Sequence, residues 1–130
     1  MKRVRTAKGR KIGSTRWLER QLNDPYVKRA RAEGYRSRAA YKLLELDERF
    51  GLLKGVRRVV DLGVAPGGWT QVVRQKAPQA AVVGIDLLPT DAIEGATLLE
   101  MDFMDEAAPE RLREALGAEA DLVLSDMAAN

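Results

Sequence analysis

The stretch Asp61-Leu62-Gly63-Val64-Ala65-Pro66-Gly67-Gly68-Trp69 lies between a short apolar run, Arg58–Leu62, and a helical pattern, Gly68–Lys76. The β-branched run predicts a buried strand, and the helical pattern starts directly after the last glycines. Glycine lets a backbone come close to a ligand because it carries no side chain. A strand, a glycine-rich loop and a helix in this order predict a ligand-binding loop on an α/β sheet.

Strands and helices alternate along the chain after this loop. Short apolar runs predict further strands at residues 82–87, 97–101 and 121–125, and a helix is predicted at 107–116. Strands separated by helices or by long crossovers form parallel sheets. The sequence therefore predicts an α/β fold, with a doubly wound parallel sheet flanked by helices.

Two helices are predicted before the sheet. Asp24-Pro25 is typical of a helix start, and Gly34 is typical of the end of the same helix. Ser37 is predicted to cap a longer second helix. Its apolar face would consist of Ala39, Leu43, Leu46 and Phe50, and the polar stripe beside it of Arg38, Lys42, Glu45 and Arg49.

The chain contains no cysteine and no histidine. These absences exclude disulfide scaffolds, thiolate and histidine metal sites, and Ser-His-Asp triads, so we expect no metal. A general base must then be Lys, Asp, Glu or Tyr. No apolar run approaches the roughly 20 residues of a membrane span, and the basic N-terminus lacks the apolar stretch of a secretory signal. We expect a cytoplasmic protein without a membrane partner.

Charge is distributed unevenly along the chain. Residues 1–50 carry a balance of +9, whereas residues 51–130 carry a balance of −6. A basic segment joined to an acidic domain indicates a polyanionic partner, and the alternative is a solvated, partly disordered tail. We divide the chain into a basic flexible arm (1–13), a helical extension (14–55) and an α/β domain (56–130).

An acidic residue stands at or near the end of every predicted strand: Asp61, Asp86, Asp102 and Asp126. The carboxyl ends of parallel strands share one edge, where open α/β folds bind ligands. Aspartate is also common in turns, which is the alternative explanation. Asp86 is placed to accept hydrogen bonds from ribose hydroxyls, and Asp102 from an adenine amino group.

The sequence of the loop limits the classes of ligand that it could bind. It departs from the G-x-G-x-x-G dinucleotide pattern, and Pro66 removes an N–H that could hold a pyrophosphate. The phosphate-binding P-loop pattern is also absent. A ligand that contains adenosine but no phosphate fits best. Trp69 is either a core aromatic or a stacking surface for that ligand.

Several segments together resemble one family, the FtsJ-like methyltransferases of large-subunit ribosomal RNA, over their N-terminal portion. They are residues 14–18 (STRWL), 24–27 (DPYV), 35–43 (YRSRAAYKL), 61–70, 86–89 (DLLP), 101–103 (MDF) and 125–130 (SDMAAN). The resemblance implies a Rossmann-like fold and transfer of a methyl group from S-adenosylmethionine to the 2′-hydroxyl of a uridine ribose in 23S-type rRNA. The partner would be rRNA within the large ribosomal subunit.

The resemblance also implies roles for individual residues. Lys42 and Asp126 would be catalytic. The cofactor would be bound by Gly67, Trp69, Asp86, Asp102 and Asp126. RNA would be bound by Arg36, Arg38 and Lys42 within the helical extension, together with lysines and arginines of the basic arm. Tyr35 and Tyr41 would either stack on bases or pack against the sheet.

The family has a second catalytic lysine and a glutamate whose positions lie beyond Asn130, and its sheet has more strands than the four predicted here. We therefore expect a sheet that is truncated after about the fourth strand. Two residues depart from the family pattern, Val64 in place of alanine and Ala129 in place of proline. Two alternatives stay open: an RNA- and cofactor-binding fragment without turnover, or a related 2′-O-methyltransferase that acts on another RNA.

Overall fold

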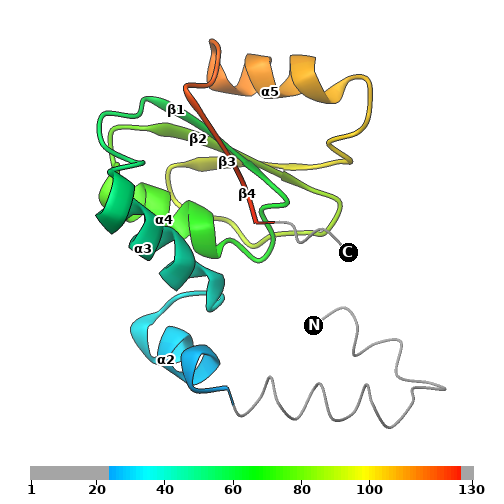
Figure 1. The fold of residues 1–130 in the computed structure, drawn as a ribbon. Coiled ribbons are helices and arrows are strands. Elements are labelled where there is room, and N and C mark those ends of the chain that lie inside the picture. The colour runs from blue at the N-terminus through cyan, green and yellow to red at the C-terminus, as the bar shows by residue number, and fades with distance from the viewer. Residues whose placement is uncertain (1–23, 127–130) are drawn as a thin grey trace, which may run out of the picture.

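The structure, a computed structural model, describes residues 24–126. The predicted basic arm, the segment 14–18 and the last four residues, Ala129 included, lie outside the described residues. A four-stranded parallel sheet forms the centre of the molecule (Figure 1). Its strands, in spatial order, are β3 (Ala96–Glu100), β2 (Ala81–Asp86), β1 (Arg58–Leu62) and β4 (Leu122–Ser125).

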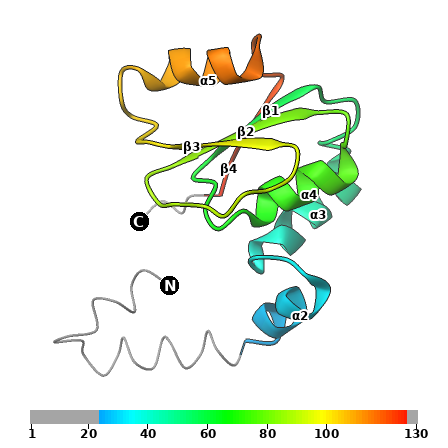
Figure 2. The ribbon, with the colours of Figure 1, turned by 180° about the vertical axis from the view of Figure 1, so that it is seen from behind.

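Helices cover both faces of this sheet. Helices α3 (Ala39–Phe50) and α4 (Gly68–Lys76) lie on one face, and α5 (Ala108–Leu116) lies on the other (Figures 1 and 2). Helix α2 (Pro25–Glu33) extends beyond α3, away from the sheet. The prediction of a Rossmann-like α/β fold with a flanked parallel sheet is confirmed.

Alternating side chains of the strands supply both cores. Val59 and Val82 point to the face that carries α3 and α4, while Val60 and Val83 point to the face that carries α5. Strands buried on both faces have continuous apolar runs rather than alternating ones. This explains why β1 and β2 were recognisable in the sequence as β-branched runs.

The order of the strands reverses direction at β1. The chain moves from β1 to β2 to β3 in one direction, and β4 then pairs with the opposite edge of β1. The crevice between the carboxyl ends of β1 and β4 is therefore the topological switch point, where open α/β sheets bind their ligands.

The end signals of α2 are confirmed. The Asp24 carboxylate accepts hydrogen bonds from the backbone N–H groups of Tyr26 and Val27, at 2.7 and 3.3 Å. Gly34 ends the helix in the left-handed conformation, with φ at 87°, which costs glycine little because it has no Cβ.

Two expectations for the second helix are wrong. The helix begins at Ala39, two residues after the predicted cap Ser37, and the Ser37 side chain lies toward the glycine loop instead of capping the helix. Phe50 is 65% exposed, because the helix turns its Ala40 and Leu43 side toward the sheet. The polar stripe, by contrast, lies on the exposed side as predicted.

None of the helices within residues 24–126 is long and apolar enough to cross a membrane. Over the same residues, no group of three acidic or other metal-binding side chains is arranged to hold a metal ion.

Candidate active site

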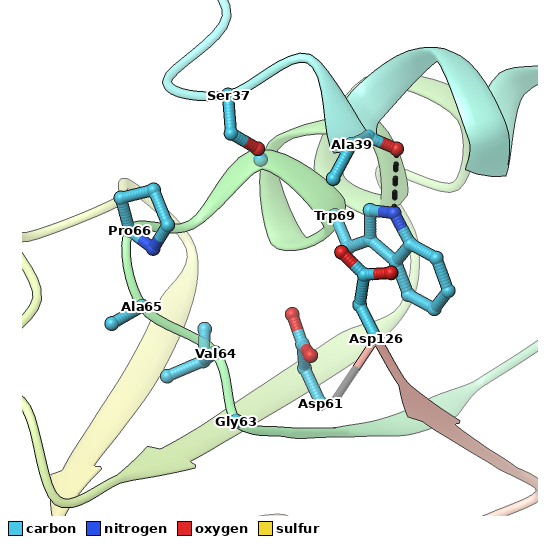
Figure 3. A pocket seen from close by; sticks show the side chains of 10 residues that line it. Ser37, Ala39, Asp61, Gly63, Val64, Ala65, Pro66, Trp69 and Asp126 are labelled. Carbon is cyan, nitrogen blue, oxygen red and sulfur yellow. Dashed lines mark hydrogen bonds between the residues drawn. The ribbon is translucent and has the colours of Figure 1, made fainter. Parts of the chain in front are cut away.

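A hollow opens at the carboxyl edge of the sheet, at the switch point between β1 and β4 (Figure 3). Its empty volume, open solvent included, is about 230 Å³. The hollow is too small to enclose a whole drug-sized molecule, so it suits one part of a larger ligand. It is lined by Ser37, Ala39, Asp61, Gly63, Val64, Ala65, Pro66, Gly68, Trp69 and Asp126.

Asp61 is the buried charge of this hollow. Only 1% of the residue is exposed, and its Oδ2 accepts a 2.8 Å hydrogen bond from the hydroxyl of Thr70 in α4. Burial raises the pKa of Asp61 to about 6; the nearby Asp126 and Asp86 carboxylates add to the rise, and the Thr70 bond opposes it. A cation in the hollow would therefore be favoured, because it would relieve this clustering of negative charge.

Asp126 follows β4 directly and lines the hollow together with Asp61 and Trp69 (Figure 3). Partial burial raises its pKa, and the positive charge of Lys42 opposes that rise. Lys42 is exposed on α3. The two residues to which the resemblance assigns catalysis thus lie near enough for the charge of one to act on the other, although they stand on elements distant in the sequence.

The glycines of the loop make room for neighbouring protein. A Cβ atom at Gly67, where φ is 117°, would lie 2.7 Å from Cδ1 of Ile93, and a Cβ at Gly68 would lie 2.5 Å from Oγ of Ser37. Both distances are too short for real contacts. These glycines are therefore required for close packing of the loop, whether or not a ligand is bound. Gly67 itself is buried behind the lining of the hollow.

Val64 and Gly84 form a matched pair behind the loop. Val64 is buried, and a Cβ atom at Gly84 in β2 would come within 2.6 Å of its Cγ2. The valine that departs from the family pattern thus fills the space left by a glycine on the neighbouring strand.

Trp69 serves the core and the hollow together. The residue is 7% exposed and packs in the cluster between α3, α4 and the sheet. Its Nε1 donates a 2.7 Å hydrogen bond to the backbone oxygen of Ala39, and part of its ring lines the hollow (Figure 3). The two readings of Trp69 from the sequence are therefore compatible.

Asp86 and Asp102 differ in their relation to the hollow. Asp86 stands directly behind it, and its two oxygens accept hydrogen bonds from the N–H groups of Ala65, at 2.9 Å, and Leu88, at 3.0 Å. Asp102 is exposed and accepts from the N–H of Met104 at 2.9 Å, which closes the turn after β3. Asp86 thus ties the glycine loop to β2, while Asp102 lies outside the lining of the hollow.

The predicted RNA-binding arginines have different surroundings. Arg38 is exposed, pairs with the Asp24 carboxylate and lies over the ring of Tyr26, 4.9 Å from its centre. The guanidinium of Arg36 is half-buried and donates to backbone carbonyls of two other loops. Lys42, described above, projects from the same helix that supplies Ala39 to the hollow.

Tyr35 and Tyr41 pack against one another edge to face, with ring centres 5.6 Å apart. The Tyr35 hydroxyl donates to Gln75 at 2.8 Å, and the Tyr41 hydroxyl donates to Glu33. That bond lowers the pKa of Glu33, while burial together with the bond raises the pKa of Tyr41 to about 12. Tyr35 also packs against the buried cluster between α3, α4 and the sheet, whereas stacking of either ring on bases stays a prediction.

Sequence reasoning missed some contributors to this region. Asp61 was singled out only as one of four acidic residues, although a charged residue inside the apolar run VVDL was a signal of a buried functional group. Ser37 was assigned to a helix cap. Gln71, whose side chain accepts from the Arg36 N–H at 2.8 Å and donates to the Gly34 oxygen at 3.1 Å, carried no local signal.

The fold and this hollow define the class of protein as a Rossmann-like α/β protein with an acidic ligand edge. The FtsJ-like methyltransferase family model matches residues 35–130. Ribosomal RNA large subunit methyltransferase E of Rhizorhabdus wittichii is 70% identical over 128 residues, which are 98% of this chain and 56% of the relative. Proteins of the same name from Novosphingobium aromaticivorans and Sphingopyxis alaskensis are 71% and 72% identical over 98% of this chain, and 58% and 56% of their own lengths are covered.

A solved structure gives the same result at lower identity. A Plasmodium falciparum chain assigned as a ribosomal RNA methyltransferase is similar with a TM-score of 0.64 at 33% identity, over 74% of this chain and 58% of that chain. The chain belongs to the FtsJ-like methyltransferase family. It spans a little over half the length of the curated relatives that it matches.

Proposed function

We propose that the chain is the cofactor-binding and RNA-facing part of an enzyme that methylates the 2′-hydroxyl of a uridine ribose in large-subunit, 23S-type rRNA. The methyl donor would be S-adenosylmethionine, and the enzyme would act in the cytoplasm on the large ribosomal subunit. The observation that carries the proposal is the acidic hollow beside the glycine loop, which Asp61 and Asp126 line at the carboxyl edge of the sheet. The names of the relatives support rRNA as the substrate.

The donor set of the hollow suits this cofactor. S-adenosylmethionine would supply a methyl group on a positively charged sulfonium, and the hollow presents Asp61 and Asp126, with Asp86 close behind. Burial and mutual repulsion raise the pKa of Asp61, so a cation at this position is favoured. Asp86 stands at the end of β2, where an acidic residue of a nucleotide-binding sheet accepts from ribose hydroxyls.

The chain's own residues would act mainly by alignment. A ribose hydroxyl must lie in line with the methyl group and must lose a proton. The Asp126 carboxylate lines the hollow and would orient the reacting groups, and the positive charge of Lys42 favours the charged form of that carboxylate against the effect of burial. By the family resemblance, the group that removes the proton is a lysine whose position lies beyond Asn130.

RNA would approach over the helical extension. Arg38 stands directly before α3 and Lys42 lies within it, and both residues are exposed. The same helix supplies Ala39 to the lining of the hollow. Contacts of such residues with phosphates give affinity and salt dependence rather than sequence choice. The basic residues of 1–23 would add to this surface.

Transfer of a tritiated methyl group to large ribosomal subunits from cells that lack the modification tests the proposal. The 130-residue chain and the full-length Rhizorhabdus wittichii relative should be assayed in parallel, and the product digested to nucleosides. We expect 2′-O-methyluridine from the longer protein. Cofactor and RNA binding by the 130-residue chain without transfer would support the binding-fragment alternative, whereas label on a base rather than a ribose would contradict the proposal.

Alanine variants test Lys42 in that assay, with Lys54 as the control, and both are made in the full-length relative at the positions that align with these two lysines. Both lysines are exposed, but Lys54 lies in the turns before β1, at the opposite end of the sheet. We expect loss of about two orders of magnitude in transfer rate for Lys42→Ala, the usual effect of losing a positioned catalytic group, and an unchanged rate for Lys54→Ala. Equal rates would remove Lys42 from the catalytic set.

A further inference from the structure

Three separate pieces of the chain converge on the guanidinium group of Arg36, which lies in the link between α2 and α3. Its Nη1 donates to the backbone oxygen of Pro66, at 3.2 Å, and to that of Asp91, at 2.6 Å. Its Nη2 donates to the backbone oxygen of Ala92 at 2.7 Å. The side chain thus bridges the glycine loop and the connection between β2 and β3.

The packing around this guanidinium is close. A Cβ atom at Gly67 would lie 3.2 Å from Nη1 and 3.3 Å from Cδ of Arg36, and 2.7 Å from Cδ1 of Ile93. Arg36, Gly67 and Ile93 therefore come together where the glycine loop meets the β2–β3 connection. A larger residue in the loop would displace either the arginine or the connection.

Further hydrogen bonds hold the backbone around Arg36 in place. The Arg36 backbone N–H donates to Oε1 of Gln71 in α4, and Nε2 of Gln71 donates to the Gly34 oxygen. A second arginine, Arg74, donates to the Glu94 oxygen at 3.2 Å and so holds the far end of the same connection. The link, α4 and the connection form one hydrogen-bonded unit.

Carbonyl oxygens compete with phosphates for the same N–H groups. Three hydrogen bonds to carbonyls use three of the five N–H groups of the Arg36 guanidinium, and they leave Nη1 with no N–H for a phosphate. Arg38, two residues later, is exposed and pairs with the Asp24 carboxylate at the surface. The two arginines thus differ in their surroundings although they stand in the same motif.

We propose that Arg36 is a positioning residue of the cofactor site, in place of the RNA-phosphate contact that the resemblance implied for it. It holds the Pro66–Gly67 turn and the 91–93 segment at a fixed separation, on either side of the path from the hollow to the end of β2. This role rests on the proposed binding of S-adenosylmethionine, because it concerns the loop that would hold that molecule. Its physical basis is preorganisation, since a site held in place before binding loses less freedom on binding.

The three hydrogen bonds by which Arg36 joins the glycine loop to residues 91 and 92 are called the clamp below. Hydrogen exchange of the ligand-free chain tests this clamp without a cofactor. Arg36→Lys keeps the charge but cannot span three carbonyls, and Arg49→Lys on the exposed end of α3 is the control. We expect faster exchange in segments 63–68 and 90–95 for Arg36→Lys, with unchanged exchange in β1 and β2 and an unchanged melting temperature. Wild-type exchange in both segments would overturn the proposal.

Calorimetry and RNA binding separate positioning from phosphate contact. We expect Arg36→Lys to weaken S-adenosylmethionine binding about fivefold or more, which is about 1 kcal/mol, and to leave RNA affinity and its salt dependence unchanged. Unchanged cofactor affinity in Arg36→Ala, together with a salt slope lower by about 1, would show a phosphate contact instead. If the wild type itself fails to bind S-adenosylmethionine, the proposed function fails, and the exchange result still decides the clamp.

Discussion

The two faces of the sheet differ in the size of the buried core that covers them, and the candidate site lies on the face with the larger core. Among residues 24–126, twelve buried residues form the core under α3 and α4, whereas three form the core under α5. The glycine loop, Asp61 and Trp69 all stand on the α3–α4 side. Groups that must hold a precise geometry are thus attached to the part of the molecule with the most restricted side chains.

The face that carries α3 and α4 is also the more sensitive of the two to substitution. A closely packed core tolerates neither a cavity nor an extra atom, and it disfavours an unpaired charge. The α5 face has partly buried leucines and an exposed Val123, so changes there have more room to relax. The following substitutions measure this contrast.

Leu43→Ala should have the largest effect. Leu43 is fully buried between α3 and the sheet, so its truncation is expected to lower the free energy of unfolding by about 2–5 kcal/mol. Leu112→Ala, in the half-buried contact of α5, should lower it by less than about 2 kcal/mol. Urea unfolding of both variants measures these two losses. A larger loss of unfolding free energy in Leu112→Ala would show that the α5 core, and not the α3–α4 core, contributes more to stability.

Asp61→Asn should stabilise the ligand-free chain at neutral pH. Burial raises the pKa of Asp61 from 3.8 to about 6, so the folded state holds a proton that the unfolded state has lost between those values. Stability of the wild type therefore falls as pH rises from about 4 to about 6, and it stays lower above that range. Asparagine keeps an acceptor for Thr70 and carries no charge, so the gain at pH 7.5 is on the order of 2 kcal/mol.

Chemical unfolding of wild type and Asp61→Asn between pH 4 and 8 measures this gain. The same variant should bind S-adenosylmethionine less tightly, because the hollow loses negative charge. A variant that is less stable than the wild type at pH 7.5 would show that the ionised carboxylate is favoured in the fold.

Gly84→Ala tests the tight contact behind the loop. The new methyl group would meet Val64, so we expect a loss of about 1–3 kcal/mol in the free energy of unfolding. Val64→Ala, which restores the family's residue at that position, should recover much of the loss in the double variant. Strictly additive effects in this double-mutant cycle would mean that the two side chains are not in contact.

Glu119→Gln should have the smallest effect. Its carboxylate lies 3.2 Å from Arg113 on the α5 side, and both side chains are exposed. Surface ion pairs contribute between about 0 and 1 kcal/mol, so the melting temperature should change little and less still at high salt. A loss as large as that of Leu43→Ala would contradict the view of α5 as a loosely coupled cover.

Local signals predicted most of the fold. The apolar runs of β1 to β4 and the Asp24 and Gly34 ends of α2 depend on neighbouring residues alone, and their predicted bounds agree within one residue. The exposure of Phe50 and the position of Ser37 depend on how α3 rotates against the sheet, which is a tertiary effect. The clamp by Arg36 was beyond reach for the same reason, because its partners are 30 to 56 residues away.

Some features of the candidate site were predictable from the sequence and others were not. The shared edge of Asp61, Asp86 and Asp126 followed from the parallel topology, whereas the catalytic roles of Lys42 and Asp126 were implied by the family resemblance and stay predictions. No pattern in the sequence separated Asp86, which is tied to the glycine loop, from Asp102, which closes a turn outside the hollow.

Calorimetric titration with S-adenosylmethionine tests the central claim most directly, with Asp86→Asn compared against Asp121→Asn. Asp86 stands at the carboxyl edge, while Asp121 joins β4 to the start of β1 at the opposite edge, where bonds from the Arg58 and Arg57 N–H groups lower its pKa. We predict one S-adenosylmethionine per chain, binding about tenfold weaker in Asp86→Asn, and an affinity in Asp121→Asn equal to that of the wild type. Equal affinity in wild type and Asp86→Asn, or a loss confined to Asp121→Asn, would contradict a cofactor site at the carboxyl edge.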